Sequence, residues 1–223
     1  MYFHFLVEDI SGAELIKILM QKITSTSSDV YYDCKAFKGI GHLPKVNTAE
    51  EAKNADSKML LNSLPQRLRG LSKSLQKSQS AIVVVLDNDR RNTEKFYAQL
   101  ESMAVQCGVT VDHVFCIAVE EIEAWLLGDE SAIVKAYPQA KTKGKLRILH
   151  NYEQDSICGT WEVLADVVYP GGLLKLRKSG DNPGMLKSEW AKNIGVHMDL
   201  QNNKSPSFQR FLAEIQKRIT IAS

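Results

Sequence analysis

Apolar runs alternate with helix-like patterns over the first 127 residues. The strongest run, Ala81 to Leu86, is apolar throughout and rich in valine, which is typical of a strand buried on both faces at the centre of a parallel sheet. The strand-like runs lie at 2–7, 30–37, 81–87 and 113–119. Apolar residues at helical spacing predict helices at 11–23, 59–76, 93–106 and 121–127, and Ser11 is the expected N-cap of the first helix. This alternation predicts an α/β fold with a central parallel sheet flanked by helices, as in Rossmann-like proteins.

The last third of the chain has a different pattern. It is richer in Gly, Lys and Asn, and turns are expected at 169–172 and 182–184. Short helices are predicted at 160–168, 186–194 and 207–219. We therefore expect a catalytic α/β core over residues 1–130 and a mainly helical extension over residues 131–223 that packs on the core.

Composition sets the broad class of protein. Of 223 residues, 44% are hydrophobic, which is enough for a core and argues against global disorder. The four cysteines show neither zinc-site spacing nor a secreted disulfide framework. The first residues lack the pattern of a signal peptide, and no apolar run approaches the ~20 residues of a membrane span. We expect a cytoplasmic protein with no membrane partner.

Two carboxylates, Asp87 and Asp89, directly follow the buried run. Ligands of open α/β sheets bind at the carboxyl ends of strands, and two close carboxylates repel each other unless a cation lies between them. Oxygen ligands favour a hard ion such as Mg²⁺ or Mn²⁺. The alternative is a turn with solvated acids.

A second acid, Glu8, follows the first strand. If that strand neighbours the one before Asp87, Glu8 lies near Asp87 and Asp89. The alternative is a carboxylate that only favours the start of a helix.

A third acidic group, Glu120, Glu121 and Glu123, follows the fourth strand. In a helix Glu121 and Glu123 would diverge, whereas in an extended segment they would share a face. The pattern leaves both arrangements open, and Trp125 beside them is interpreted as a core residue.

The net charge of +2 is too small to indicate a nucleic-acid partner, so any basic surface must be local. One candidate group for phosphate contacts is Lys141, Lys143, Lys145 and Arg147, with Arg90 beside the acidic turn. A second basic group is Lys175, Arg177, Lys178, Lys187 and Lys192. The alternative for both groups is a solvated face.

The order of these motifs resembles a known family. A Glu after strand one and an Asp-x-Asp after a later strand are similar to the Toprim domain of topoisomerases, primases and overcoming-lysogenization-defect nucleases. The segments 7–11, 85–89 and 121–129, with 155–162 and 205–208 in the tail, resemble more closely a bacterial Toprim-like family of unknown function. Asp9 stands where many Toprim domains carry Gly.

The resemblance implies a Mg²⁺- or Mn²⁺-dependent nuclease acting on DNA or RNA. By the Toprim pattern, Glu8 is a general acid/base or metal ligand, Asp87 and Asp89 hold the metal, and Glu121 and Glu123 complete its shell. Related nucleases often work with an ATPase in anti-phage defence, so a separate ATPase subunit is an expected partner. Two alternatives stay open: a non-catalytic Toprim-like interaction subunit, and a nucleotide-sugar-dependent transferase that uses the Asp-x-Asp.

Overall fold

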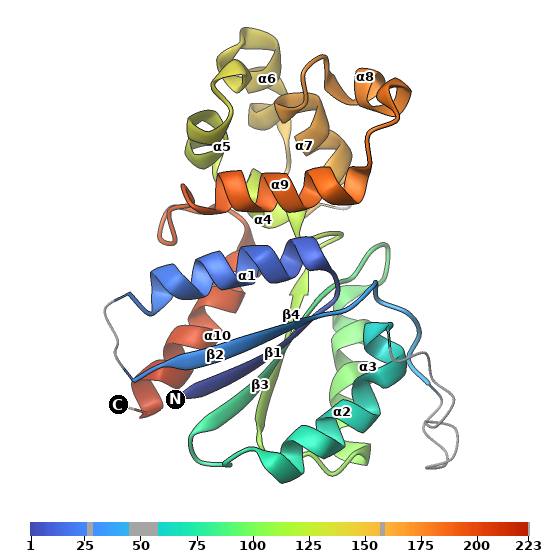
Figure 1. Ribbon diagram of the computed structural model, residues 1–223, viewed down its shortest axis with the longest axis vertical. Coiled ribbons are helices and arrows are strands. Elements are labelled where there is room, and N and C mark those ends of the chain that lie inside the picture. The colour runs from blue at the N-terminus through green and yellow to red at the C-terminus, as the bar shows by residue number, and fades with distance from the viewer. Residues whose placement is uncertain (26–28, 45–57, 157–158, 223) are drawn as a thin grey trace.

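A computed structural model describes residues 1–25, 29–44, 58–156 and 159–222 (Figure 1). Its strands are all parallel and form a sheet in the order β2-β1-β3-β4. The strands are β1 (Tyr2–Val7), β2 (Tyr31–Ala36), β3 (Ser80–Asp87) and β4 (Asp112–Ala118). The predicted α/β class with a central parallel sheet is confirmed.

Helices flank the sheet and make up the C-terminal part of the chain. The first three are α1 (Ile10–Ile23), α2 (Leu60–Ser74) and α3 (Thr93–Gln106). After β4 come α4 (Glu123–Leu127), α5 (Glu130–Ala136), the 3₁₀ turn η2 (Pro138–Lys141), α6 (Lys143–Asn151), α7 (Thr160–Val168), α8 (Gly172–Ser179), α9 (Pro183–Gly195) and α10 (Pro206–Ala222). No helix in the described ranges is long and apolar enough to cross a membrane.

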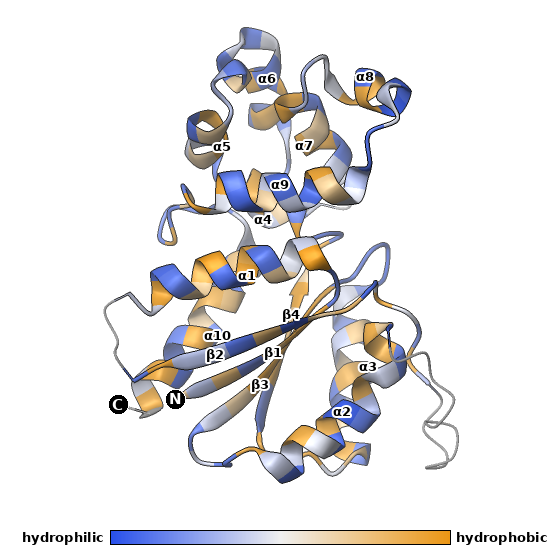
Figure 2. Ribbon diagram, viewed as in Figure 1, coloured by the Kyte–Doolittle hydropathy of each residue, from blue (hydrophilic) through white to orange (hydrophobic). Residues whose placement is uncertain are grey.

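The central strand β3 is buried on both faces, as its sequence predicts. Ile82, Val84 and Leu86 point to the layer of α2 and α3, whereas Val83 and Val85 point to the layer of α1 and α10. All five are at most 1% exposed. Figure 2 shows the matching apolar faces of the helices turned toward the sheet.

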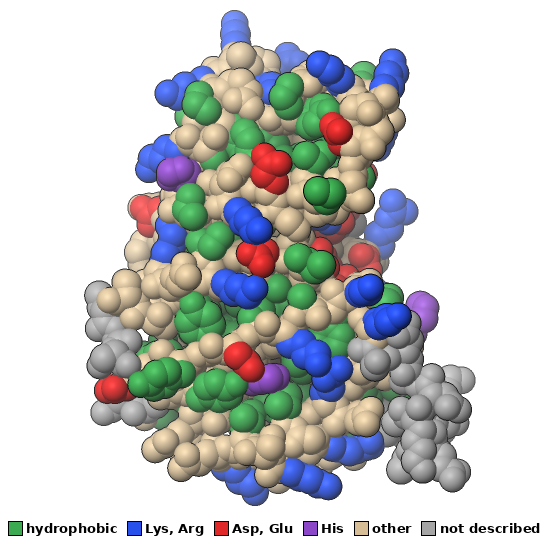
Figure 3. All heavy atoms as spheres, in the orientation of Figure 1, with side chains coloured by type: hydrophobic (Ala, Val, Ile, Leu, Met, Phe, Trp, Pro, Cys, Tyr) green, Lys and Arg blue, Asp and Glu red, His purple; other side chains and the backbone are tan. Residues whose placement is uncertain are grey.

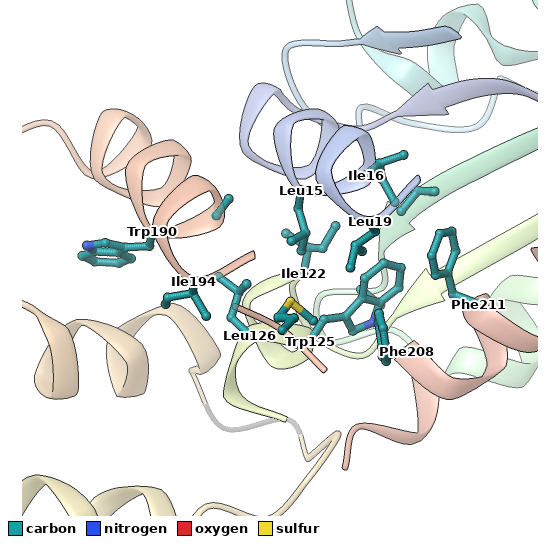
Figure 4. Packing of buried hydrophobic residues seen from close by; sticks show 14 of the residues in the cluster. Leu15, Ile16, Leu19, Ile122, Trp125, Leu126, Trp190, Ile194, Phe208 and Phe211 are labelled. Atoms are coloured by element: carbon teal, nitrogen blue, oxygen red, sulfur yellow. The ribbon is translucent and has the colours of Figure 1, made fainter. Parts of the chain in front are cut away.

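Helices α4 to α9 form a further layer beyond the carboxyl ends of the strands, and α9 lies along α1 (Figure 1). Trp125 anchors this junction, because its ring packs against Phe208 and Phe211 at centroid distances of 5.7 and 4.9 Å (Figure 4). Its Nε1 donates a hydrogen bond to Ser207 Oγ at 2.9 Å. The interpretation of Trp125 as core is confirmed.

Residues from both sides of the predicted boundary at residue 130 belong to one apolar cluster. Helix α1 contributes to it from the first part of the chain, and α9 and α10 contribute from the second. Helix α10 returns to cover β4. The boundary between residues 1–130 and 131–223 therefore stays a prediction.

The start of α1 differs from expectation. Asp9 is the N-cap: its Oδ1 accepts from Gly12 N at 2.7 Å, and its backbone is extended, with φ −140°. Ser11 is not the cap, because its hydroxyl donates to Asp9 Oδ2 at 2.6 Å. The extended backbone at Asp9 needs no glycine. The chain does need one at Gly12, where an added Cβ would lie 2.9 Å from the Val7 side chain.

Candidate functional site at the carboxyl edge of the sheet

Glu8 and Asp87 meet at the end of two neighbouring strands. β1 pairs directly with β3, and Val7 lies opposite Val85. The backbone N–H of Asp87 donates to Glu8 Oε2 at 2.9 Å. Glu8 Oε2 is thereby fixed, which leaves Oε1 to face other groups. The expectation that Glu8 lies beside Asp87 is confirmed.

Burial sets the protonation of both carboxyl groups. It raises the pKa of Glu8 to about 7, partly opposed by the hydrogen bond from Asp87 and assisted by the charges of Asp89 and Asp9. Burial also holds the pKa of Asp87 well above its ordinary value, with the charges of Glu8 and Glu123 as further causes. Residue Asp87 keeps some accessible surface, although protein atoms surround its carboxyl group. Glu8 therefore exchanges a proton near neutral pH, and the protonated form of Asp87 is favoured relative to an exposed aspartate.

The carboxylate of Asp89 forms an ion pair with Arg91. Asp89 has a left-handed backbone, with φ +47°, and its Oδ2 accepts from Arg91 Nη1 at 2.6 Å. Half of its side chain is exposed. Asp89 therefore borders the site with its charge already paired.

Asn88, which the sequence motifs do not single out, holds this turn in place. It is fully buried, and its Nδ2 donates to Arg91 O at 3.1 Å and to Thr93 Oγ1 at 2.7 Å. Its Oδ1 accepts from Glu120 N at 2.5 Å. One amide side chain thus ties the end of β3, the start of α3 and the segment after β4 together.

Glu121 and Glu123 converge on a lysine from a distant part of the chain. Lys187 Nζ, on α9, lies 3.2 Å from Glu121 Oε1 and 3.2 Å from Glu123 Oε2. The second contact lacks hydrogen-bond geometry, so the buried Glu123 Oε2 has no hydrogen-bond donor among the described residues. The two glutamates share a partner because a tight turn, and not a regular helix, precedes α4.

The charges of these side chains shift one another's pKa values. Burial raises the pKa of Glu123 to about 7 against the attraction of Lys187. Burial disfavours the charged form of Lys187, but Glu123, Glu121 and Asp87 outweigh it and raise its pKa above the ordinary value. We call Glu8, Asp87, Glu121, Glu123 and Lys187 the acidic site. Figure 3 shows acidic side chains set back between the adjoining ends of α1 and α9.

Glu120 has a structural contact instead. Its two carboxylate oxygens accept from Gly159 N at 2.9 Å and Thr160 N at 2.7 Å, at the start of α7. Glu121 Oε2 accepts from Trp161 N at 3.3 Å in the same turn. The segment after β4 therefore joins the sheet edge to α7.

The donor set of the acidic site fits a divalent cation. It consists of carboxylate oxygens, which hard cations prefer, and it includes a buried oxygen without a hydrogen-bond donor. Within the described ranges, however, no three His, Cys, Asp or Glu side chains form a ready-made metal-binding group. Lys187 pairs with Glu121 and Glu123, and Arg91 pairs with Asp89, whereas Glu8 is joined to the backbone of Asp87.

Lys187, from the second basic group, belongs to the acidic site, whereas the bases of η2 and α6 lie apart from it. Lys141, Lys143 and Arg147 are exposed on η2 and α6, at the outer end of the helical layer (Figure 1). Lys145 instead donates to Val167 O at 2.5 Å. Arg90 is exposed in the turn after β3, beside Asp89.

The family model described as a domain of unknown function, DUF4276, matches residues 7–216. No curated protein and no solved structure matches the chain.

Proposed function

We propose, from the premise that the chain belongs to the DUF4276 family, that it is a Mg²⁺- or Mn²⁺-dependent enzyme that cleaves phosphodiester bonds in nucleic acid. The observation that carries this proposal is the joining of Glu8 and Asp87 at the carboxyl edge of a parallel sheet, beside the buried Glu123. Such edges are where α/β proteins place their ligands.

A polyanion cannot approach several carboxylates unless a cation reverses the local charge. We assign Glu8 and Asp87 as the ligands of the cation, with Asp89, Glu121 and Glu123 as side chains that reach it after leaving Arg91 and Lys187. A bound divalent ion supplies charge neutralisation at the phosphate and a more acidic water.

The chain's own groups contribute the rest. Glu8 would offer Oε1 to the cation, because Oε2 is held by the Asp87 amide. Its pKa of about 7 in the metal-free protein means that it gives up a proton near neutral pH when a cation binds. Lys187 keeps its positive charge and offsets the carboxylates beside it. Exposed Arg90, at the rim, is placed to meet a phosphate of the substrate.

The order of the acids supports a relation to Toprim nucleases and, with it, a role as an anti-phage effector that works with a separate ATPase. The non-catalytic alternative is favoured by one observation: Lys187 and Arg91 already pair with three of the acids. Metal binding separates the two functions, because a purely structural cluster need not respond to Mg²⁺.

The test is calorimetric titration of Mn²⁺ and Mg²⁺ into the wild type, Asp87→Asn and Glu153→Gln. Glu153 is an exposed acid outside the acidic site and serves as the matched control. We expect binding heat from the wild type and the control and its loss from Asp87→Asn. Equal heats from all three proteins would remove Asp87 from the site.

Cleavage is then assayed on single- and double-stranded DNA and RNA, with any ATPase encoded beside this protein included. We expect activity that chelation abolishes and that Glu8→Gln removes without loss of fold. Full cleavage by the Glu8→Gln, Asp87→Asn double variant, in a preparation free of contaminating nuclease, would refute the mechanism.

A further inference from the structure

A groove of about 740 Å³ lies between the first turn of α1, the end of β2 and one side of α9 from Gly184 to Lys192. Asp9 and Ser188 line it, and they directly follow Glu8 and Lys187 of the acidic site. The hollow between the ends of α1 and α9 in Figure 3 is this region. The groove therefore opens beside the acidic site.

Two apolar side chains that line the groove are exposed among the described residues. Ile10 on α1 is 60% exposed and Met185 on α9 is 73% exposed, and both line the groove. Phe37, just past the end of β2, also lines the groove, but it is only 4% exposed and belongs to the core beside α2. Single exposed apolar residues are ordinary, but two that line one concave surface indicate an apolar ligand.

The charged lining residues are two bases and two acids, of which Lys192 and Asp9 already have partners, so Lys38 is the cation left for an anionic group among the described residues that line the groove. Lys38 and Lys192 line the groove, and the latter is also 3.6 Å from Glu14. The anionic lining residues are Asp9 and Glu189, and Asp9 is already bonded to Gly12 N and Ser11 Oγ at the start of α1. A flat apolar group attached to a phosphate matches this combination, and a nucleotide unit has both.

We propose that this groove holds one unstacked base of a single-stranded nucleic acid, next to the phosphodiester at the acidic site. The inference rests on the proposed function and names its substrate class. In a duplex each base is paired and stacked, so a base could enter the groove only after it leaves the helix. A single strand offers its bases without that cost, and contact with the base faces is tolerant of sequence.

The test measures binding by fluorescence anisotropy with Ca²⁺ in place of Mg²⁺ to suppress cleavage, and with Glu8 intact so that the acidic site keeps its cation ligands. The probes are a labelled single strand, the same strand annealed to its complement, and an abasic strand with the same phosphates. The groove variant carries Ile10→Ala and Met185→Ala. The control carries Val105→Ala, because Val105 is 77% exposed on α3 and does not line the groove.

We expect the single strand to bind more tightly than the duplex and the abasic strand. The groove variant should lose about 5- to 20-fold in affinity for the single strand. This loss is near the low end of what removal of a base contact costs, because Ile10 and Met185 are aliphatic and not aromatic. Its affinity for the abasic strand should stay unchanged, as should every affinity of the control. Equal affinities for the intact and abasic strands, or equal losses in groove variant and control, would overturn the inference.

The cleavage assay keeps this outcome distinct from failure of the proposed function. If duplex and single strand are cut equally well with and without the groove substitutions, the function stands and the groove inference fails. If the protein with intact Glu8 cuts neither and binds no Mg²⁺, the proposed function itself fails.

Discussion

Glu8 and Glu123 of the acidic site hold protons where most carboxylates would be charged. Glu8 and Glu123 have pKa values raised to about 7 by burial, against an ordinary value near 4.5. Between these two pH values the folded protein binds more protons than the unfolded chain. Stability of the metal-free protein should therefore fall as pH rises from about 4.5 to about 7.

We predict that Glu123→Gln makes this decline shallower, because the amide cannot titrate. The measurement is urea unfolding in chelator from pH 4.5 to 8, with the result expressed as the difference between variant and wild type. In this difference the contributions of groups that titrate in the same range in both proteins, such as His4, cancel. Mg²⁺ should stabilise the wild type more at pH 8 than at pH 5, because metal ligands must lose their protons. Parallel pH profiles for the two proteins would contradict the assignment.

Elements were predictable where their signals are local. The β-branched run of β3 and the spacing of α3 lie within one segment, and both form as expected. Helices α5, α6 and α8 were not predicted; they have only seven to nine residues, and α8 begins at Gly172. The acids of the site were predictable for the same local reason. Lys187 was assigned to a basic surface, because its pairing with Glu121 spans 66 residues.

Asp155, in the C-terminal part of the chain, holds the start of helix α10. Asp155 Oδ1 accepts from Ser205 Oγ at 2.7 Å, and Oδ2 accepts from Ser207 N at 2.5 Å, at the start of α10. Its backbone has φ +55°, a conformation that Asp and Asn tolerate better than other side chains.

We predict that Asp155→Asn destabilises the protein by about 1–2 kcal/mol, as loss of a helix cap does. Asn keeps the shape and the backbone preference but cannot accept both hydrogen bonds with its single oxygen. Glu153→Gln, two residues earlier and exposed, should change stability by less than about 0.5 kcal/mol. Chemical unfolding compares the two, and equal stabilities would show that the carboxylate does not hold α10.

At the scale of the whole molecule, the acidic site lies at the junction between the sheet and the helical layer, whereas the exposed bases of η2 and α6 lie at the far end of that layer (Figure 1). A nucleic acid that reached both would have to extend along the helical layer. Because the net charge is only +2, such binding would depend on this local surface.

We predict that replacing Lys141, Lys143 and Arg147 with Ala makes the log-affinity against log-salt slope shallower by roughly 0.7 to 0.9 for each phosphate that the protein no longer neutralises. Lys145 is left in place, because its bond to Val167 O is part of the fold. A matched triple substitution of exposed Lys73, Lys77 and Lys95, on and near α2 and α3, is the control. If both variants keep the wild-type slope, the α6 surface is simply solvated.

The hydrogen bond from the Asp87 amide to Glu8 has a consequence for spectroscopy. A backbone N–H that donates at 2.9 Å to a carboxylate senses whether that carboxylate carries a proton. The amide resonance of Asp87 should therefore follow the charge of Glu8 through a titration, without any label at the side chain. It gives nuclear magnetic resonance a reporter inside the acidic site, built into the backbone of its central strand.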